Sequence, residues 1–211
     1  MLDVHPPQHS AHSWRDFFIH IITITIGLFI ALMLEAGVEH LHNRHLLHTA
    51  QENLRTELSD NRKNLEFDRK QLDGSTQQFQ QDIVLLEALK EHKTLPENFA
   101  IRWDWNSMQA AAWDTARDTG ALSLMSYEDA HAYDTLYRQQ QMVNEESAGY
   151  IRDVYRAEEP LQAGKRSFTD LSPAEIDAMI SAIQQTLVDI QYLDDICDSL
   201  RRLYQSTGDN L

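Results

Sequence analysis

Histidines are concentrated in the first quarter of this 211-residue chain, at a spacing that suits metal binding. Eight of the ten lie within the first 48 residues: His5, His9, His12, His20, His40, His42, His45 and His48. In a helix, the last three of these advance three residues at a time and Glu52 follows four residues later, so four side chains form an oblique row. Imidazole and carboxylate groups bind zinc, and imidazole also binds copper and haem iron. The candidate ligands of a metal ion or haem are therefore His42, His45, His48 and Glu52.

A second interpretation of the histidine row needs no metal. One helix alone supplies too few ligands in a closed geometry, so a site would have to form between several copies of the chain. Neutral imidazoles are also tolerated at the headgroup boundary of a membrane, where they stay partly hydrated. His20 lies deeper, one turn inside an apolar run, where an ionisable residue is a functional candidate. We expect no cofactor and keep a metal or haem as the alternative.

The sequence offers little that resembles catalytic machinery. Glu-x-x-His spacing occurs at Glu39/His42 and Glu128/His131, and paired motifs of this kind can build di-iron sites in helical bundles. One pair lies at the edge of the apolar run, and the other lies at an expected helix start, where acidic residues favour the helix N-terminus. The sequence has no G-x-S-x-G, H-E-x-x-H, phosphate-binding glycine loop or calcium-loop spacing. We therefore expect no enzymatic activity.

Three tryptophans lie close together in the middle of the chain, at Trp103, Trp105 and Trp113. Tryptophan is enriched at the energetic centres of protein interfaces, so this group is a candidate partner-binding patch. The alternative is that the rings fill the core of a small helical bundle and its end.

The position of the histidine row depends on the apolar segment that precedes it in the chain. Eighteen residues without a formal charge, FFIHIITITIGLFIALML, lie between Asp16 and Glu35. A helix of this length spans about 27 Å, close to the thickness of a hydrocarbon layer. A buried core helix and a cleaved signal peptide are the alternatives, but a basic leader and an A-x-A cleavage site are both lacking. We therefore predict an uncleaved transmembrane helix over residues 17–38, in contact with the lipid bilayer.

Small side chains recur every four residues in this segment, at Thr23, Gly27 and Ala31. Close backbone approach through small residues drives helix pairing in lipid. These three residues are the candidate helix–helix interface of a homo-oligomer. Basic residues are nearly balanced on the two sides of the segment, but a short leading tail usually stays in the cytoplasm. We expect a single-pass protein of the bacterial inner membrane with a periplasmic C-terminal domain.

The remaining chain has the pattern of helices in series. Apolar residues recur every seven positions at Leu58, Leu65, Leu72, Phe79 and Leu86, and the core positions between them are the polar Asn61, Asp68, Ser75 and Asp82. This coiled-coil period predicts one long helix that packs lightly on its neighbours. A helix from Trp103 to about Arg117, stopped by Gly120, and a helix opened by Ser126 and ended at Pro160 follow.

The last helix has the clearest start, the capping box of Ser172 and Glu175 with proline at the first helical position. Its apolar stripe is Ile176, Met179, Ile183, Ile190, Leu193, Cys197, Leu200 and Tyr204, widened by Ile180 and Leu187. We predict an all-α fold with a soluble, four-helix-bundle-like domain. The expected organisation is a tail over 1–16, the membrane helix over 17–38, a long juxtamembrane helix over 39–93, the bundle over 94–207 and a tail over 208–211.

Composition excludes several classes of protein. The chain has 33 acidic and 18 basic residues, a formal charge of −15, so nucleic acid is not an expected partner. Seven glycines and five prolines are few for an all-β fold with many tight turns. The single cysteine, Cys197, excludes an intrachain disulfide and a cysteine-only zinc site.

Three strings resemble a group of uncharacterised bacterial single-pass membrane proteins. They are ITIGLFIAL from Ile24, LRTELSDNRKNL from Leu54, and WDTARDTGAL from Trp113, which Leu136-Tyr137 follows. In that group an anchor of the form I-G-I-L-I-A-L leads into a helix containing E-L-x-x-N. The histidine-rich flanks depart from the group. The resemblance implies the architecture, an anchor followed by a helical domain, and no activity.

We therefore expect a membrane-anchored structural or accessory protein that binds another membrane or envelope protein. Two alternatives stay open. One is a ligand-sensing bundle that signals through a partner, because the tail before the anchor has no room for a signalling domain. The other is a metal- or haem-binding protein that uses the histidine-rich flanks.

Overall fold

The structure is a computed structural model that describes residues 14–94, 104–162 and 167–207. Within these ranges the chain contains helices and no strand, so the predicted all-α fold is confirmed. The chain divides into two compact units, Met1–Thr49 and Ala50–Leu211. The bundle therefore begins at Ala50 and includes part of the long helix, whereas the sequence pattern placed its start at residue 94. His5, His9, His12, Trp103 and both predicted tails, apart from residues 14–16, lie outside the described residues.

The first helix, α1, runs from Trp14 to Lys90 over 77 residues. Its part in the first unit, residues 14–49, has no buried residue. An 18-residue window near its N-terminus has a mean hydropathy of 2.5 and is 0 % buried. This helix is thus long and apolar enough to cross a membrane, and its apolar window does not serve as the core of the chain.

α1 ends three residues before the predicted boundary at residue 93, and its C-terminal turn explains why. The Lys93 N–H donates to the Ala88 carbonyl at 3.1 Å, and the His92 N–H donates to the Leu89 carbonyl at 2.9 Å. These two bonds form a Schellman motif, which requires a left-handed residue after the helix. His92 takes that role with φ 62°, a conformation that most L-residues adopt at a cost.

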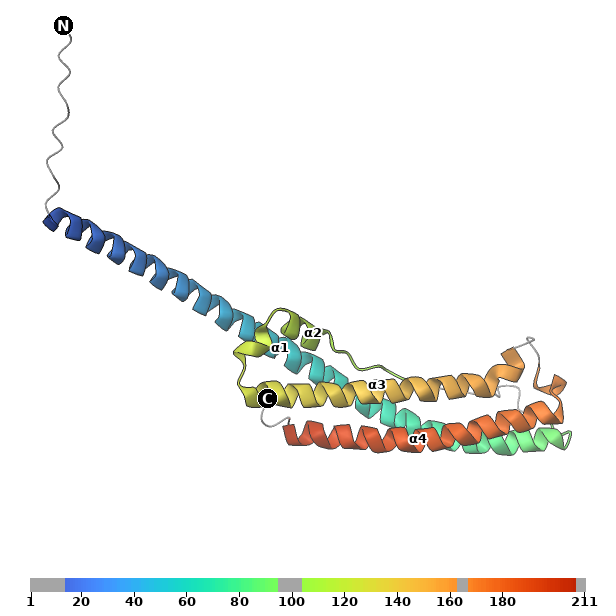
Figure 1. The fold of residues 1–211 in the computed structure, drawn as a ribbon. Coiled ribbons are helices and arrows are strands. Elements are labelled where there is room, and N and C mark those ends of the chain that lie inside the picture. Colours follow the sequence, from blue (N-terminus) through green and yellow to red (C-terminus); the bar gives the residue numbers. More distant parts are fainter. Residues whose placement is uncertain (1–13, 95–103, 163–166, 208–211) are drawn as a thin grey trace, which may run out of the picture. The chain divides into compact units, whose positions relative to one another are not determined.

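The second unit is built on three long helices: residues 50–90 of α1, α3 (Tyr127–Gln162) and α4 (Pro173–Thr207) (Figure 1). Each helix buries residues at alternating steps of three and four, the pattern of coiled-coil packing. In α3 the buried residues are Tyr133, Leu136, Tyr137, Gln140, Val143, Ser147, Tyr150, Val154 and Ala157. In α4 all eight residues predicted at this spacing are buried, and so are Ile180, Thr186 and Ile196, whereas Leu187 is half-buried.

Pairs of bonded residues define the helix directions. Glu57 bonds Tyr137, and further along both helices Ser75 bonds Tyr150, so α1 and α3 are parallel. Arg69 pairs with Asp194, and further along α1 Lys90 pairs with Asp177, which precedes Asp194 in α4. α4 is therefore antiparallel to α1. Two parallel neighbours cannot be joined by a tight turn, and the described part of the connection between α1 and α3 runs back along the bundle.

That return passes through an extended segment, residues 104–110, which we call the strap. The short helix α2 (Ala111–Asp118) and a 3₁₀ turn, η1 (Ala121–Leu124), follow it. The predicted helix from Trp103 to Arg117 is therefore wrong in its described first half, because residues 104–110 are not helical. Its predicted stop is correct, since Gly120 has φ 78° directly after the helix.

The start signals of the two later helices are confirmed. The Glu175 N–H donates to Ser172 Oγ at 3.4 Å, and the Ser172 N–H donates to Glu175 Oε2 at 2.8 Å, which completes the capping box of α4. The Asp129 N–H donates to Ser126 Oγ at the start of α3. α3 continues two residues beyond Pro160, and a second 3₁₀ turn, η2 (Phe168–Asp170), precedes α4.

Candidate functional site

The histidine row does not converge on a metal site within one chain. His42, His45 and His48 lie on exposed positions of α1, and Glu52 is exposed as well. Among the residues that the structure describes, no group of three or more histidine, cysteine, aspartate or glutamate side chains is arranged to hold a metal ion. A site shared between copies of the chain stays a prediction.

The small residues of the apolar window are all exposed. A methyl group added at Gly27 would meet nothing within 4 Å. The Thr23 hydroxyl donates to the Ile19 carbonyl at 2.8 Å, so its polar group is satisfied within the helix. Ala31 is exposed one helical turn beyond Gly27. The strip is thus accessible to a second helix, and the predicted interface stays a prediction.

Trp105 and Trp113, the described members of the predicted tryptophan patch, pack against different tyrosines of α3 and do not form one patch. The rings of Trp113 and Tyr137 stack with centroids 5.2 Å apart. Trp105 contacts Tyr150 edge to face, with centroids 6.5 Å apart. Tyr137 and Tyr150 lie about 20 Å apart along the helix. Both indoles are half-buried, which favours the alternative that they cover the bundle core.

The strap lies in the groove between α1 and α3, where two asparagines bind its main chain. Asn61 of α1 accepts from the Gln109 N–H at 2.8 Å and donates to the Gln109 carbonyl at 2.7 Å. Asn144 of α3 accepts from the Met108 N–H at 3.0 Å and donates to the Met108 carbonyl at 2.8 Å. Two successive residues of the strap therefore have both of their backbone groups satisfied by side chains of the bundle.

Two carboxylates of α1 bind further main-chain N–H groups, one before and one after the residues that the asparagines hold. Asp68 Oδ1 accepts from the Asn106 N–H at 2.8 Å. Glu57 Oε2 accepts from the Ala112 N–H at 2.9 Å, in the first turn of α2. The bonded partners on α1 therefore run backwards, from residue 68 to 57, as the strap runs forwards. Apart from a long bond from the Asn106 side-chain amide to Asp68 Oδ1, at 3.5 Å, these contacts are to the main chain, so they place few demands on the side chains of the strap.

A buried polar layer across the three helices supports Asn61. The Asn61 amide also donates to Gln140 Oε1 of α3 at 2.7 Å, and Gln140 donates to the Tyr204 hydroxyl of α4 at 2.9 Å. Asn61 and Gln140 are 1 % and 2 % exposed. Buried amides restricted in this way hold a fixed orientation, which is what bidentate binding of a backbone requires.

Asp68 is not fully satisfied in this arrangement. It is 0 % exposed, and its Oδ2 has no hydrogen-bond partner among the described residues. Burial raises the pKa of Asp68 from 3.8 to about 6; the bonds from Asn106 oppose the shift and the nearby charge of Asp104 adds to it. The indole N–H of Trp105 is buried as well, and it has no partner within the part of the chain that the structure describes. The strap thus leaves one acceptor and one donor unused.

A small pocket opens beside the strap. Its volume is about 280 Å³, and Met108, Gln109, Trp113, Tyr137, Gln140 and Asn144 are among the residues that line it. The two arginines at its rim are both ion-paired, Arg117 with Asp114 at 3.0 Å and Arg138 with Asp134 at 2.8 Å. Burial and its bond to Glu57 raise the pKa of Tyr137, so this phenol stays protonated and acts as a donor. The arrangement suits binding of uncharged groups rather than proton transfer.

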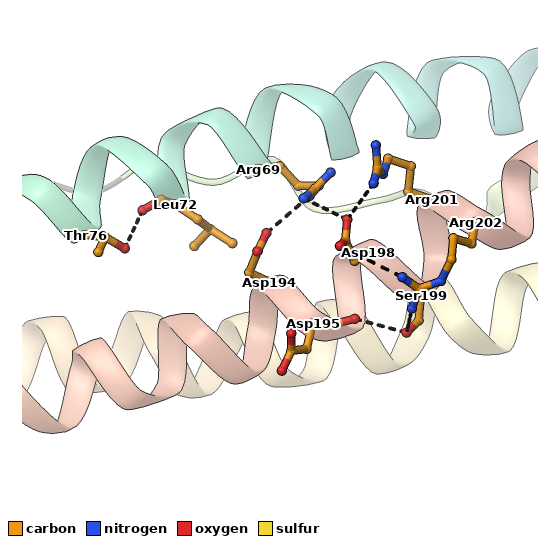
Figure 2. A network of polar contacts seen from close by, with 9 residues as sticks. All are labelled: Arg69, Leu72, Thr76, Asp194, Asp195, Asp198, Ser199, Arg201 and Arg202. Carbon is orange, nitrogen blue, oxygen red and sulfur yellow. Dashed lines mark hydrogen bonds and ion pairs between the residues drawn. The ribbon is translucent and has the colours of Figure 1, made fainter.

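An ion network fixes α4 against α1 on another side of the bundle. Figure 2 shows Arg69 of α1 between Asp194 and Asp198 of α4, at 3.2 Å and 2.8 Å. Arg201, which is also on α4, pairs with Asp198 at 3.0 Å. Cys197 is buried nearby, and burial raises the pKa of its thiol to about 12. The network therefore contributes to helix registration, and the thiol is inert.

The polar residues of the α1 seam are the part of the site whose role the sequence analysis did not recognise. Asn61, Asp68, Ser75 and Asp82 break the apolar period of α1, which we interpreted as weaker packing. All four are buried, and two of them hold the strap. Their regular recurrence at core positions was the available signal. Their partners lie 38 and 48 residues away in the sequence, which no local pattern reveals.

Fold and site together define the class: an all-α protein with a membrane-length apolar helix and a three-helix domain that holds an extended segment. Comparisons with protein families, with curated proteins and with solved structures found no match to this chain. The arguments about function therefore rest on the residues described above.

Proposed function

We propose that this chain is a membrane-anchored accessory protein whose bundle binds another membrane or envelope protein. The anchor is residues 17–38 of α1, in a single-pass arrangement in the bacterial inner membrane with a periplasmic bundle. The exposed window of mean hydropathy 2.5 supports the anchor, because an apolar surface of this size needs a lipid or protein environment. The function is binding without catalysis.

One observation carries the binding part of this proposal: the α1–α3 groove already binds an extended polypeptide through its main chain. Asn61 and Asn144 each make a donor and an acceptor bond to one residue of the strap. Backbone bonds of this kind are the usual source of affinity when proteins bind extended peptides. The bundle thus has the chemistry of a polypeptide-binding domain.

Reciprocal purification from the native membrane tests this function. The full chain carries an affinity tag and is extracted in mild detergent after crosslinking in the membrane. We expect one partner at fixed stoichiometry, and purification of the tagged partner should return this chain. The matched control is Ile183→Asp, which keeps the anchor but disrupts the bundle core and should lose the partner. A wild-type chain that is recovered without a stoichiometric partner, or with a bound chromophore instead, contradicts the proposal.

A separate experiment tests on which side of the membrane the bundle lies. Val188 is 61 % exposed on α4, whereas the native Cys197 is buried and inert. A Val188→Cys variant should react with a membrane-impermeant maleimide in intact spheroplasts, and the unchanged chain should not. Labelling that appears only after lysis would place the bundle in the cytoplasm.

A further inference from the structure

The strap is held like a bound peptide rather than like a loop that is part of the core. Its carbonyl and N–H groups are bound by Asn61, Asn144 and Asp68, and only the Met108 side chain is fully buried, at 4 % exposure. The side chains of Asn106, Ser107 and Gln109 are exposed. Main-chain bonds with one apolar anchor are the pattern by which proteins recognise extended peptides.

The strap is also an incomplete occupant of the groove. A segment whose apolar contacts are the buried Met108 and the half-buried ring of Trp105 is expected to open at a lower free energy than the helices around it. Asp68 is 0 % exposed, and among the described residues neither its Oδ2 nor the indole N–H of Trp105 has a hydrogen-bond partner. A buried acceptor left without a donor destabilises the state that contains it. A different segment with a donor at this point would fit the groove better.

We propose that the α1–α3 groove is a binding site for an extended segment of a partner protein, which replaces the strap and places an apolar side chain where Met108 lies and a basic side chain where Asn106 lies. This inference rests on the proposed function and names the kind of partner segment that the bundle takes.

Charge determines the choice of a basic side chain. The carboxylate of Asp68 lies beside the Asn106 position and stays in the groove when the strap leaves, and the chain carries a formal charge of −15. The Asn106 amide reaches only Asp68 Oδ1, at 3.5 Å. A lysine or arginine at that position supplies a charged donor for the unused oxygen. A second copy of this chain would bring the same asparagine and the same negative charge, so it is the poorer occupant.

Hydrogen exchange on the wild-type full chain in detergent tests whether the groove opens. The amides of Asn106, Met108, Gln109 and Ala112 should exchange at least about 100-fold faster than core amides of α4 such as that of Leu193, because the strap opens without unfolding of the helices. Equal exchange, with the strap protected until the whole bundle unfolds, overturns the proposal.

Peptide binding tests the kind of segment. The probes are fluorescent seven-residue peptides: one has the sequence of residues 104–110, and one has lysine in place of the asparagine. The receptor is the full-length Met108→Ser variant, whose own strap has lost its anchor; wild-type chain serves as a second receptor, because the tethered strap competes at a high effective concentration. The lysine peptide should bind the variant at least about tenfold more tightly than the asparagine peptide, and the wild type more weakly than the variant.

Two controls separate groove binding from nonspecific adsorption. A lysine peptide methylated on the methionine backbone nitrogen cannot donate to Asn144 and should lose binding. Asn144→Ala in the receptor should have the same effect. Binding that is unchanged by both controls, or equal for the lysine and asparagine peptides, overturns the proposal. Either of these two results would overturn only the groove proposal. The proposed function would still be tested by reciprocal purification, because a partner that contacts another face of the bundle would still be recovered.

Discussion

The two parts of α1 are helical for different reasons. In residues 14–49 the large apolar side chains are exposed apart from the half-buried Leu46 and Leu47, and Leu28 and Phe29 are both 59 % exposed. In residues 50–90 the apolar side chains of the seam are buried, and Leu65 and Leu86 are both 0 % exposed, whereas Phe67 and Val84 lie off the seam and are exposed. Both parts contain large apolar residues, but in the second part these alternate with many charged and amide residues. An unbroken apolar run surrounds the helix and requires an apolar solvent, whereas an apolar residue every three to four positions defines one face and requires neighbouring helices.

The largest effect should come from adding charge to the first part. Replacing residues 27–33 with a polar stretch that contains lysines should release the chain from the membrane, because each central charge costs about 2.5–3.5 kcal/mol of insertion free energy. Carbonate washing of membranes measures this release. Circular dichroism of the released chain should still show the cooperative melting of the bundle, because the two parts depend on different environments. A wild-type chain that is found in the soluble fraction would refute the anchor.

The same kind of change in the second part should unfold the bundle and leave the chain in the membrane. Ile183 is 1 % exposed, so Ile183→Asp buries an unpaired charge and should cost about 3–5 kcal/mol of unfolding free energy. Leu187 is half-buried at the α1–α4 groove, so Leu187→Asp should cost about 1 kcal/mol. Thermal melts of the full chain in detergent give both values. Equal melting temperatures for the two variants would mean that the structure misplaces the core stripe.

A smaller effect is expected at Asp68, where the second part buries charge instead of apolar surface. The pKa of Asp68 is about 6 in the folded chain against an ordinary value of 3.8. The folded chain therefore binds more protons between these values, and stability falls as the pH rises from about 4 to about 6 and stays low above that. Asp68→Asn keeps the acceptor for the Asn106 N–H and removes the charge. At pH 7 it should add about 1–3 kcal/mol to the unfolding free energy.

Urea unfolding of both chains at pH 5 and pH 7.5 measures this difference. The wild type should be more stable at pH 5 than at pH 7.5 as far as Asp68 contributes, and Asp68→Asn should reduce that dependence. A variant that is less stable than the wild type at pH 7.5 would show that the charge of Asp68 is needed to hold the strap.

The smallest effect should appear between copies of the first part. If Thr23, Gly27 and Ala31 form a contact, cysteines introduced at Gly27 should crosslink in the membrane several-fold more than cysteines at Leu28, one position around the helix. The native Cys197 is buried, so it adds little background. Gly27→Ile with Ala31→Ile should reduce the crosslinking of the full chain. Equal, weak crosslinking at both positions would mean that the strip does not join two copies of this chain and contacts a different protein instead.

Much of the fold was predictable because it depends on local periodicity. The seam of α1 and the stripe of α4 were identified from spacing alone, and their apolar residues are buried apart from the half-buried Leu187. The capping box at Ser172 and Glu175 was equally predictable from the sequence, since its hydrogen bonds join residues only three positions apart. In each case the signal and the interaction lie within one or two helical turns.

The strap was not predictable for the opposite reason. Residues 104–110 have a composition compatible with a helix, but their N–H groups bond Asn61, Asp68 and Asn144, which are 36 to 48 residues distant. These bonds replace those a helix would make, and tertiary contacts thereby override local propensity. The candidate site depends on the same contacts. The sequence pattern therefore marked the polar seam positions without revealing what they bind.

The polar residues of the seam also affect how the chain is made. The last residue of α1 is synthesised more than 100 residues before the last residue of α4. At a translation rate of about 5–20 residues per second, α1 is therefore without its complete antiparallel partner for roughly 5–25 s. An unbroken apolar seam would present an aggregation-prone surface throughout that interval. Because Asn61, Asp68, Ser75 and Asp82 alternate with the apolar residues, the nascent helix exposes only separated apolar side chains while it waits. The same four residues that weaken the seam as a zipper should therefore reduce aggregation of the incomplete bundle through this face of α1.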